Sequence, residues 1–125
     1  MAENMEVRLI YGGDEAYYSP ATDTVHLPPQ EAFFSTDARI GTTLHELSHA
    51  TSAPSRPDRS VVGCLEDPDK YAVEELRAEI ASTFVSAEIG ANIPDSVIEN
   101  HLAYVQSWLS QIKEDHNVLF NAIKE

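Results

Sequence analysis

Residues 35–52 read STDARIGTTLHELSHATS, and this stretch decides the fold of the chain. Ser35 offers a hydroxyl that can cap a helix, and Pro54 ends the helical pattern just after residue 52. Apolar residues recur within the stretch at i, i+4 and i+7, namely Ile40, Leu44 and Leu47. This spacing predicts an amphipathic helix with one apolar face.

The same helix carries the pattern H-E-x-x-H at residues 45–49. Successive residues turn by about 100°, so His45 and His49 lie one turn apart on one face and both imidazoles can reach one metal ion. Glu46 beside them is the expected general base of a metal-dependent hydrolase. With five histidines in 125 residues, roughly 0.02 chance matches to this pattern are expected. Two histidines that merely cap a helix or pair with acids are therefore the weaker interpretation.

A catalytic zinc site needs a third protein ligand, and no further histidine follows His49 closely. The ligand must come from another segment, and the predicted helix over residues 68–89 is rich in acids. Glu75 and Glu79 lie one turn apart on one face of it. One of them can bind Zn²⁺ while the other accepts a hydrogen bond from a ligating imidazole. Glu74 points further from the apolar stripe and is expected to be plain surface.

The remaining pattern predicts an α+β fold in one domain over residues 1–125. Three short strands are expected to form a small antiparallel N-terminal sheet: Val7–Ile10, Ala16–Ser19 and Thr24–Leu27. This sheet should pack on a core of three to four helices.

Helix signals follow the loop of residues 53–66. Asp67-Pro68 begins the second helix and Gly90 ends it. Its expected apolar stripe is Val73, Leu76, Ile80, Phe84 and Ala87. Ser96 and Glu99 form a capping box for a third helix, and Leu119, Phe120 and Ile123 indicate a short fourth one.

Composition restricts the function classes. The formal net charge of −13 disfavours direct binding to nucleic acid or to an anionic membrane. Cys64 is the only cysteine, which excludes an internal disulfide and a thiolate zinc cluster. The chain starts with no signal-peptide pattern and has no run of about 20 apolar residues. We therefore expect a cytoplasmic protein.

Several motifs in order resemble one known family. The runs YSPATDTVHLPP (residues 18–29), LHELSH (44–49), Ser55-Arg56, EELRAE (74–79) and AYVQSWL (103–109) are similar to the metallopeptidase domain of ArdC-type antirestriction proteins. Similar domains occur in polyvalent proteins of plasmids and phages. The resemblance extends from about Leu9 to Phe120.

The resemblance implies a zincin fold with a gluzincin-like site. His45 and His49 would bind zinc, Glu46 would be the general base, and a Glu on the following helix would be the third ligand. The pattern E-x-x-A-E at residues 75–79 favours Glu75 as ligand and Glu79 as its hydrogen-bonding neighbour, with Glu79 as the alternative ligand. Full-length antirestriction proteins of this type carry a single-stranded-DNA-binding region before the domain. This chain shows none, so no direct nucleic-acid binding is expected.

The predicted activity is hydrolysis of a protein or peptide substrate. Tyr104 or His101 on the third helix could donate to the oxyanion, and an edge strand near Thr24–Leu27 could hold an extended peptide.

Two further functions compete with the general peptidase. One is a non-enzymatic acidic binding module, or a DNA mimic, with a structural zinc site. The other is a regulatory protease that cleaves a single repressor-like partner.

Overall fold

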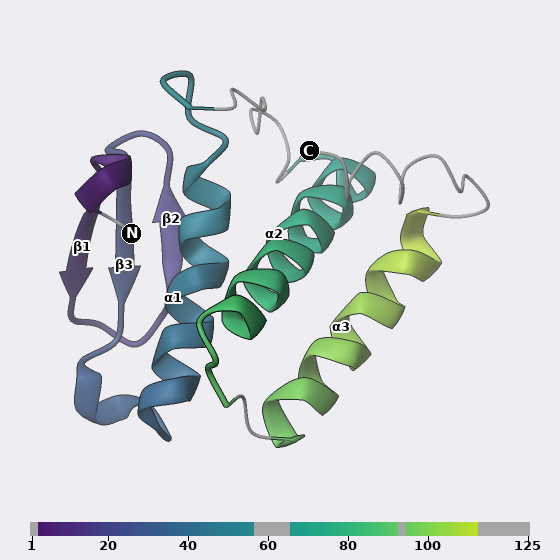
Figure 1. Cartoon of the computed structure of the whole chain (residues 1–125). Coiled ribbons are helices and arrows are strands. Elements are labelled where there is room, and N and C mark those ends of the chain that lie inside the picture. Colours follow the sequence, from purple (N-terminus) through teal and green to yellow (C-terminus); the bar gives the residue numbers. More distant parts are fainter. Residues whose placement is uncertain (1–2, 57–65, 93–94, 113–125) are drawn as a thin grey trace.

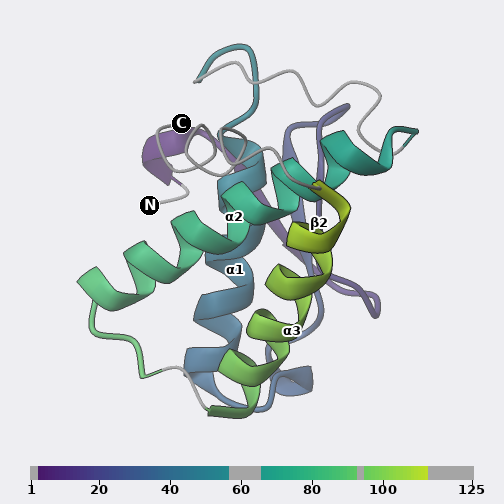
Figure 2. The same cartoon turned by 90° about the vertical axis from the view of Figure 1, so that its right-hand side faces the viewer.

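The computed structural model describes residues 3–56, 66–92 and 95–112 and has the predicted α+β fold. Figure 1 shows the sheet, α1, α2 and α3 side by side in that order. Figure 2, viewed from the α3 side, shows that α2 runs obliquely across α1. The elements are η1 (Glu3–Met5), β1 (Arg8–Tyr11), β2 (Tyr17–Ser19), β3 (Thr24–Leu27), η2 (Gln30–Ala32), α1 (Thr36–Ala50), α2 (Pro68–Glu88) and α3 (Asp95–Ile112).

The sheet is mixed, whereas the sequence predicted an antiparallel one. Its strand order is β1-β3-β2, with β1 parallel to β3 and β2 antiparallel to β3. The β2–β3 hairpin forms as expected, but β1 adds to the far side of β3. Val25 and Leu27 of β3 are fully buried, which suits a central strand. The prediction that Thr24–Leu27 is an edge strand able to hold a peptide is therefore wrong, because both of its edges are paired.

The apolar core lies between the sheet and α1. Its buried members are Val7, Val25, Leu27, Leu47 and Ala50. A second contact joins α1 to α2, where Leu44 of α1 and Leu76 of α2 are buried. Ala72 and Ala78 are also buried on α2, and side chains this small let two helix backbones approach closely.

Helix α1, which carries the H-E-x-x-H pattern, and helix α2 both begin where the sequence predicts. Ser35 accepts a hydrogen bond from the Ala38 backbone at 3.0 Å, and the Asp67 carboxylate accepts from two backbone N–H groups of the first turn of α2. Gly90 has a φ of 70° just after α2, the left-handed conformation that glycine adopts at helix ends. α3 begins at Asp95, so Ser96 lies inside its first turn and is not the cap.

The buried face of α2 differs from the predicted apolar stripe. Leu76 of that stripe is buried, but Phe84 is 69% exposed. The other buried positions of α2 carry small or acidic residues: Ala72, Glu74, Ala78, Glu79, Ser82 and Ser86. The predicted fourth helix and Cys64 lie outside the described residues. Across the described ranges, no helix combines the length and apolar character needed to cross a bilayer.

Arg56 links three segments at one end of the sheet. Its guanidinium donates to the backbone oxygens of Ala50 (2.8 Å) and Met5 (2.6 Å) and forms an ion pair with Asp23. The Tyr18 hydroxyl also donates to Asp23, at 2.9 Å. Arg56 therefore joins the end of α1, the N-terminal segment and the β2–β3 turn.

We predict that Arg56→Met lowers the free energy of unfolding by about 2 kcal/mol, because it leaves partly buried oxygens without their charged donor. Denaturant unfolding of the two proteins measures the difference. Arg8→Met, at an exposed position of β1, is the control and should change stability little. Equal stability of Arg56→Met and wild type would contradict a linking role for Arg56.

Candidate metal centre

Helix α1 presents two histidines side by side toward α2. His45 and His49 are one helical turn apart, and their Nε2 atoms lie 3.2 Å from each other. Their rings meet edge to face, with centroids 4.9 Å apart. Leu47 on the opposite side of α1 is buried in the core against the sheet, so the helix is held in the orientation that points both imidazoles at one spot.

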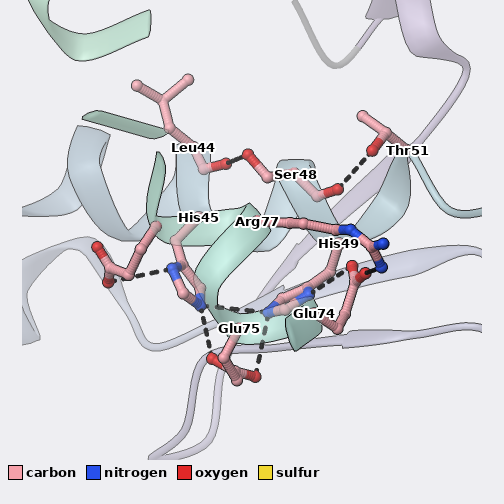
Figure 3. Close-up of polar contacts among 9 residues, drawn as sticks. Leu44, His45, Ser48, His49, Thr51, Glu74, Glu75 and Arg77 are labelled. Atoms are coloured by element: carbon pink, nitrogen blue, oxygen red, sulfur yellow. Dashed lines mark hydrogen bonds and ion pairs between the residues drawn. The ribbon is translucent and has the colours of Figure 1, made fainter. Parts of the chain in front are cut away.

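Glu75 of α2 completes a cluster of three donor atoms. Its carboxylate oxygens lie 3.3 Å from His45 Nε2 and 3.4 Å from His49 Nε2, as Figure 3 shows. The three groups are the candidate metal ligands found among the described residues. Donors bound to one zinc ion at 2.0–2.1 Å in a tetrahedral arrangement are roughly 3.3 Å apart. The observed spacings of 3.2, 3.3 and 3.4 Å therefore fit a single small divalent ion without rearrangement.

Each histidine also has a carboxylate at its other ring nitrogen. Glu79 Oε1 lies 3.4 Å from His45 Nδ1, and Glu74 Oε1 lies 3.3 Å from His49 Nδ1. Glu79 is thus on the side of His45 away from the donor cluster. Glu74 corrects the sequence analysis, which expected it at the surface: it is 5% exposed. The reason is that α2 buries an acidic face against α1.

Without a metal, the cluster holds protons tightly. Burial lowers the pKa of His45, but hydrogen bonds to Glu75 and Glu79 outweigh it and raise the pKa to about 10. The pKa of His49 rises to about 9 in the same way, against burial, through hydrogen bonds to Glu74 and Glu75. Burial raises the pKa of Glu75, but both histidines outweigh it and lower the pKa to about 2. A metal ion must therefore displace protons from the two imidazoles.

Glu46 is buried beside the three candidate ligands and lines the cavities next to them. Burial raises the pKa of its carboxyl, with the nearby histidines and a backbone hydrogen bond from Tyr18 acting in the opposite direction. A carboxyl group with a raised pKa takes up a proton more readily than an ordinary one.

Two cavities meet at these residues. The first, which we call the β2 cavity, has a volume of about 470 Å³ and is walled by Tyr17, Tyr18 and Pro20. The second, the α3 cavity, has a volume of about 450 Å³ and is walled by Thr42 and Tyr104. Both are also lined by His45, Glu46, Tyr71 and Glu75. The candidate metal centre therefore lies where the two cavities join.

Tyr71 is a site residue that the sequence analysis missed. It lies on α2 one turn before Glu75 and lines both cavities. Burial, the charge of Glu75 and a hydrogen bond with its carboxylate raise the pKa of the phenol above its ordinary value. The i, i+4 spacing from Glu75 was the signal that could have found it. Tyr104 is 58% exposed and also lines the α3 cavity, while the side chain of His101 lies outside the described residues.

A family model described as a zincin-like metallopeptidase matches residues 1–125. The chain belongs to the zincin-like metallopeptidase family. The domain is similar to ArdC, an antirestriction protein of plasmid R388, whose Mn(II)-bound crystal structure superimposes with a TM-score of 0.79 at 36% identity. That match covers 98% of this chain and 44% of ArdC. The metal-free structure of ArdC gives a TM-score of 0.72.

Curated relatives of this zincin-like domain are longer proteins. A DNA primase TraC of Escherichia coli is 43% identical over 109 residues, which cover 87% of this chain and 10% of TraC. The protein y4eC of Sinorhizobium fredii is 32% identical over 119 residues, which cover 95% of this chain and 38% of y4eC. The chain thus spans less than half of the length of each relative.

The shifted pKa values predict how the stability of the metal-free zincin-like domain depends on pH. Because both histidine pKa values are raised above 6.5, their contribution is complete below about pH 6.5 and is lost as the pH rises through about 9 and 10. The contribution of Glu75 is complete above about pH 4.5 and is lost as the pH falls toward 2. We expect the Tm to be highest between these limits and to fall from pH 6.5 to 10.

Thermal unfolding in chelator across this range measures the effect. The double variant His45→Gln/His49→Gln should show a flatter decline above pH 6.5, because it lacks the titrating imidazoles. Parallel profiles for wild type and double variant would contradict the proton-holding cluster.

Proposed function

We propose that the domain is a zinc-dependent peptidase in which His45, His49 and Glu75 bind the metal. The observation that carries this proposal is the spacing of their three donor atoms, which matches the coordination shell of one ion. Two imidazole nitrogens and one carboxylate form a ligand set that suits zinc in catalytic sites. Such sites also accept other divalent metals, and the related ArdC structure is Mn(II)-bound.

Glu46 is the proposed general base and acid. A zinc ion in such a site supplies Lewis acidity toward the scissile carbonyl and lowers the pKa of water. Glu46 then takes the proton from the attacking water and returns it to the leaving amine. Its burial next to the cluster and its presence in both cavities support this role.

The proposed substrate is an extended polypeptide. β2 is an edge strand of the sheet, and Tyr17 and Tyr18 on it wall the β2 cavity. An edge strand can pair with an extended peptide through main-chain hydrogen bonds. Tyr71 and Tyr104 are the candidate donors to the negative charge that develops on the scissile carbonyl.

The biological setting we propose follows from the relatives. ArdC is named as an antirestriction protein of a plasmid, and TraC as a primase. We infer that this domain serves a mobile genetic element in antirestriction or defence, in the cytoplasm. The net charge of −13 supports a protein substrate and disfavours direct contact with nucleic acid.

The metal site is tested by elemental analysis of the purified protein and of His49→Ala. We expect about one zinc per wild-type chain and loss of most of it in the variant, because a ligand is removed. His26→Ala, on β3 and away from the cluster in sequence, is the control and should keep the metal. Absence of metal from wild type, even after incubation with zinc, would refute the peptidase proposal.

The catalytic role of Glu46 is tested with Glu46→Gln in a peptide-cleavage assay. We expect activity to fall by roughly 100-fold or more while zinc stays bound, because only the proton acceptor is lost. The same assay compares Tyr71→Phe with Tyr104→Phe. We expect kcat to fall in the variant that has lost the hydroxyl donating to the oxyanion.

The acidic binding module is the competing function, and the charge of −13 is the observation that favours it. If Glu46→Gln retained full biological activity while charge reversal of exposed acids abolished it, the acidic binding module would be the better account of the function. Glu31→Lys and Glu88→Lys are suitable exposed positions.

A further inference from the structure

Glu74 is a buried carboxylate that the peptidase mechanism does not use. It lies on the face of α2 that contacts α1, next to Glu75 in the sequence, and is 5% exposed. A buried carboxylate is costly unless charged or hydrogen-bonding partners surround it. The side chains that contact Glu74 therefore explain how its burial is stabilised.

The two oxygens of Glu74 contact two different side chains. Oε1 lies 3.3 Å from His49 Nδ1, and Oε2 lies 3.6 Å from the guanidinium of Arg77. Figure 3 shows the carboxylate of Glu74 placed between the imidazole and the guanidinium. Arg77 is one turn further along α2, so a single helix face holds both the acid and the cation that offsets its charge.

The position of Glu74 settles which nitrogen of His49 faces the metal centre. Glu74 and Glu75 are adjacent on α2 and lie at opposite nitrogens of one ring, with Glu75 at Nε2. An ionised carboxylate can only accept, so contact with Glu74 keeps a proton on Nδ1. The proton that a metal ion displaces is then the one on Nε2, whose lone pair is directed at the cluster. Glu79 is placed in the same way at Nδ1 of His45.

We propose that Glu74, held by Arg77, is a positioning residue that fixes the orientation and tautomer of His49 for metal binding. This inference rests on the proposed function in one respect, that His49 is a metal ligand. Carboxylates in this position usually increase metal affinity by roughly 10- to 100-fold. The centre would then have one orienting carboxylate for each of its two histidines.

Zinc affinity, measured by competition with a chromophoric chelator, tests the proposal without a substrate. We expect Glu74→Leu to weaken zinc binding by roughly 10- to 100-fold and Glu74→Gln to weaken it less, because Gln keeps an acceptor of similar shape. Arg77→Met should weaken it modestly while Glu74 remains. Glu88→Gln, at an exposed position of the same helix, is the matched control and should bind zinc as wild type does.

A nuclear magnetic resonance signal separates orientation from general destabilisation. In the zinc-loaded protein, we expect a protected Nδ1 proton on His49 that is lost or strongly shifted in Glu74→Leu and retained in Glu88→Gln. Should Glu74→Leu fail to fold, Glu74→Gln and Arg77→Met provide the same readouts.

The outcomes distinguish the two proposals. If wild type binds no zinc, the metal centre itself is refuted. If wild type binds zinc and the Glu74 variants bind it equally tightly with an unchanged His49 proton signal, only the positioning role is refuted.

Discussion

The packing of α1 against α2 is the contact on which the rest of the structure depends. Neither helix holds a complete site: α1 supplies both imidazoles, and α2 supplies the carboxylates that face them. Buried alanines on α2 allow the approach, and the apolar face of α1, anchored on the sheet, sets its rotation. A small shift between the two helices would separate donor atoms that now lie 3.2 to 3.4 Å apart.

This contact brings several carboxylates together in a largely buried place. Glu46, Glu74 and Glu79 are buried near one another, with Glu75 between the histidines. Mutual repulsion and lost hydration would oppose folding, but two imidazoles and Arg77 provide the compensating positive charge. In the absence of a metal ion, protons on the two histidines supply positive charge that offsets these carboxylates.

Local sequence signals predicted α1 and α2 well, and they singled out the residues that the structure brings together, His45, His49 and Glu75. The cap at Ser35, the proline after Asp67 and the spacing of His45 and His49 depend only on neighbours along the chain. The failures concern tertiary pairing. The parallel alignment of β1 with β3 joins strands separated by a whole hairpin, and no local pattern encodes it. The burial of Glu74 depends on the rotation of α2 against α1, because an acid beside two other acids resembles a solvated helix face until its partner His49 is placed.

The two cavities that join at Glu46 determine from which directions the candidate metal centre is accessible. Along α1, the α3 cavity adjoins Gly41 and Thr42, before His45, and the β2 cavity adjoins Ser52, after His49. The centre therefore borders space toward both ends of α1 in the described part of the chain. A bound molecule can extend from Glu46 in two directions and is not confined to a single pocket.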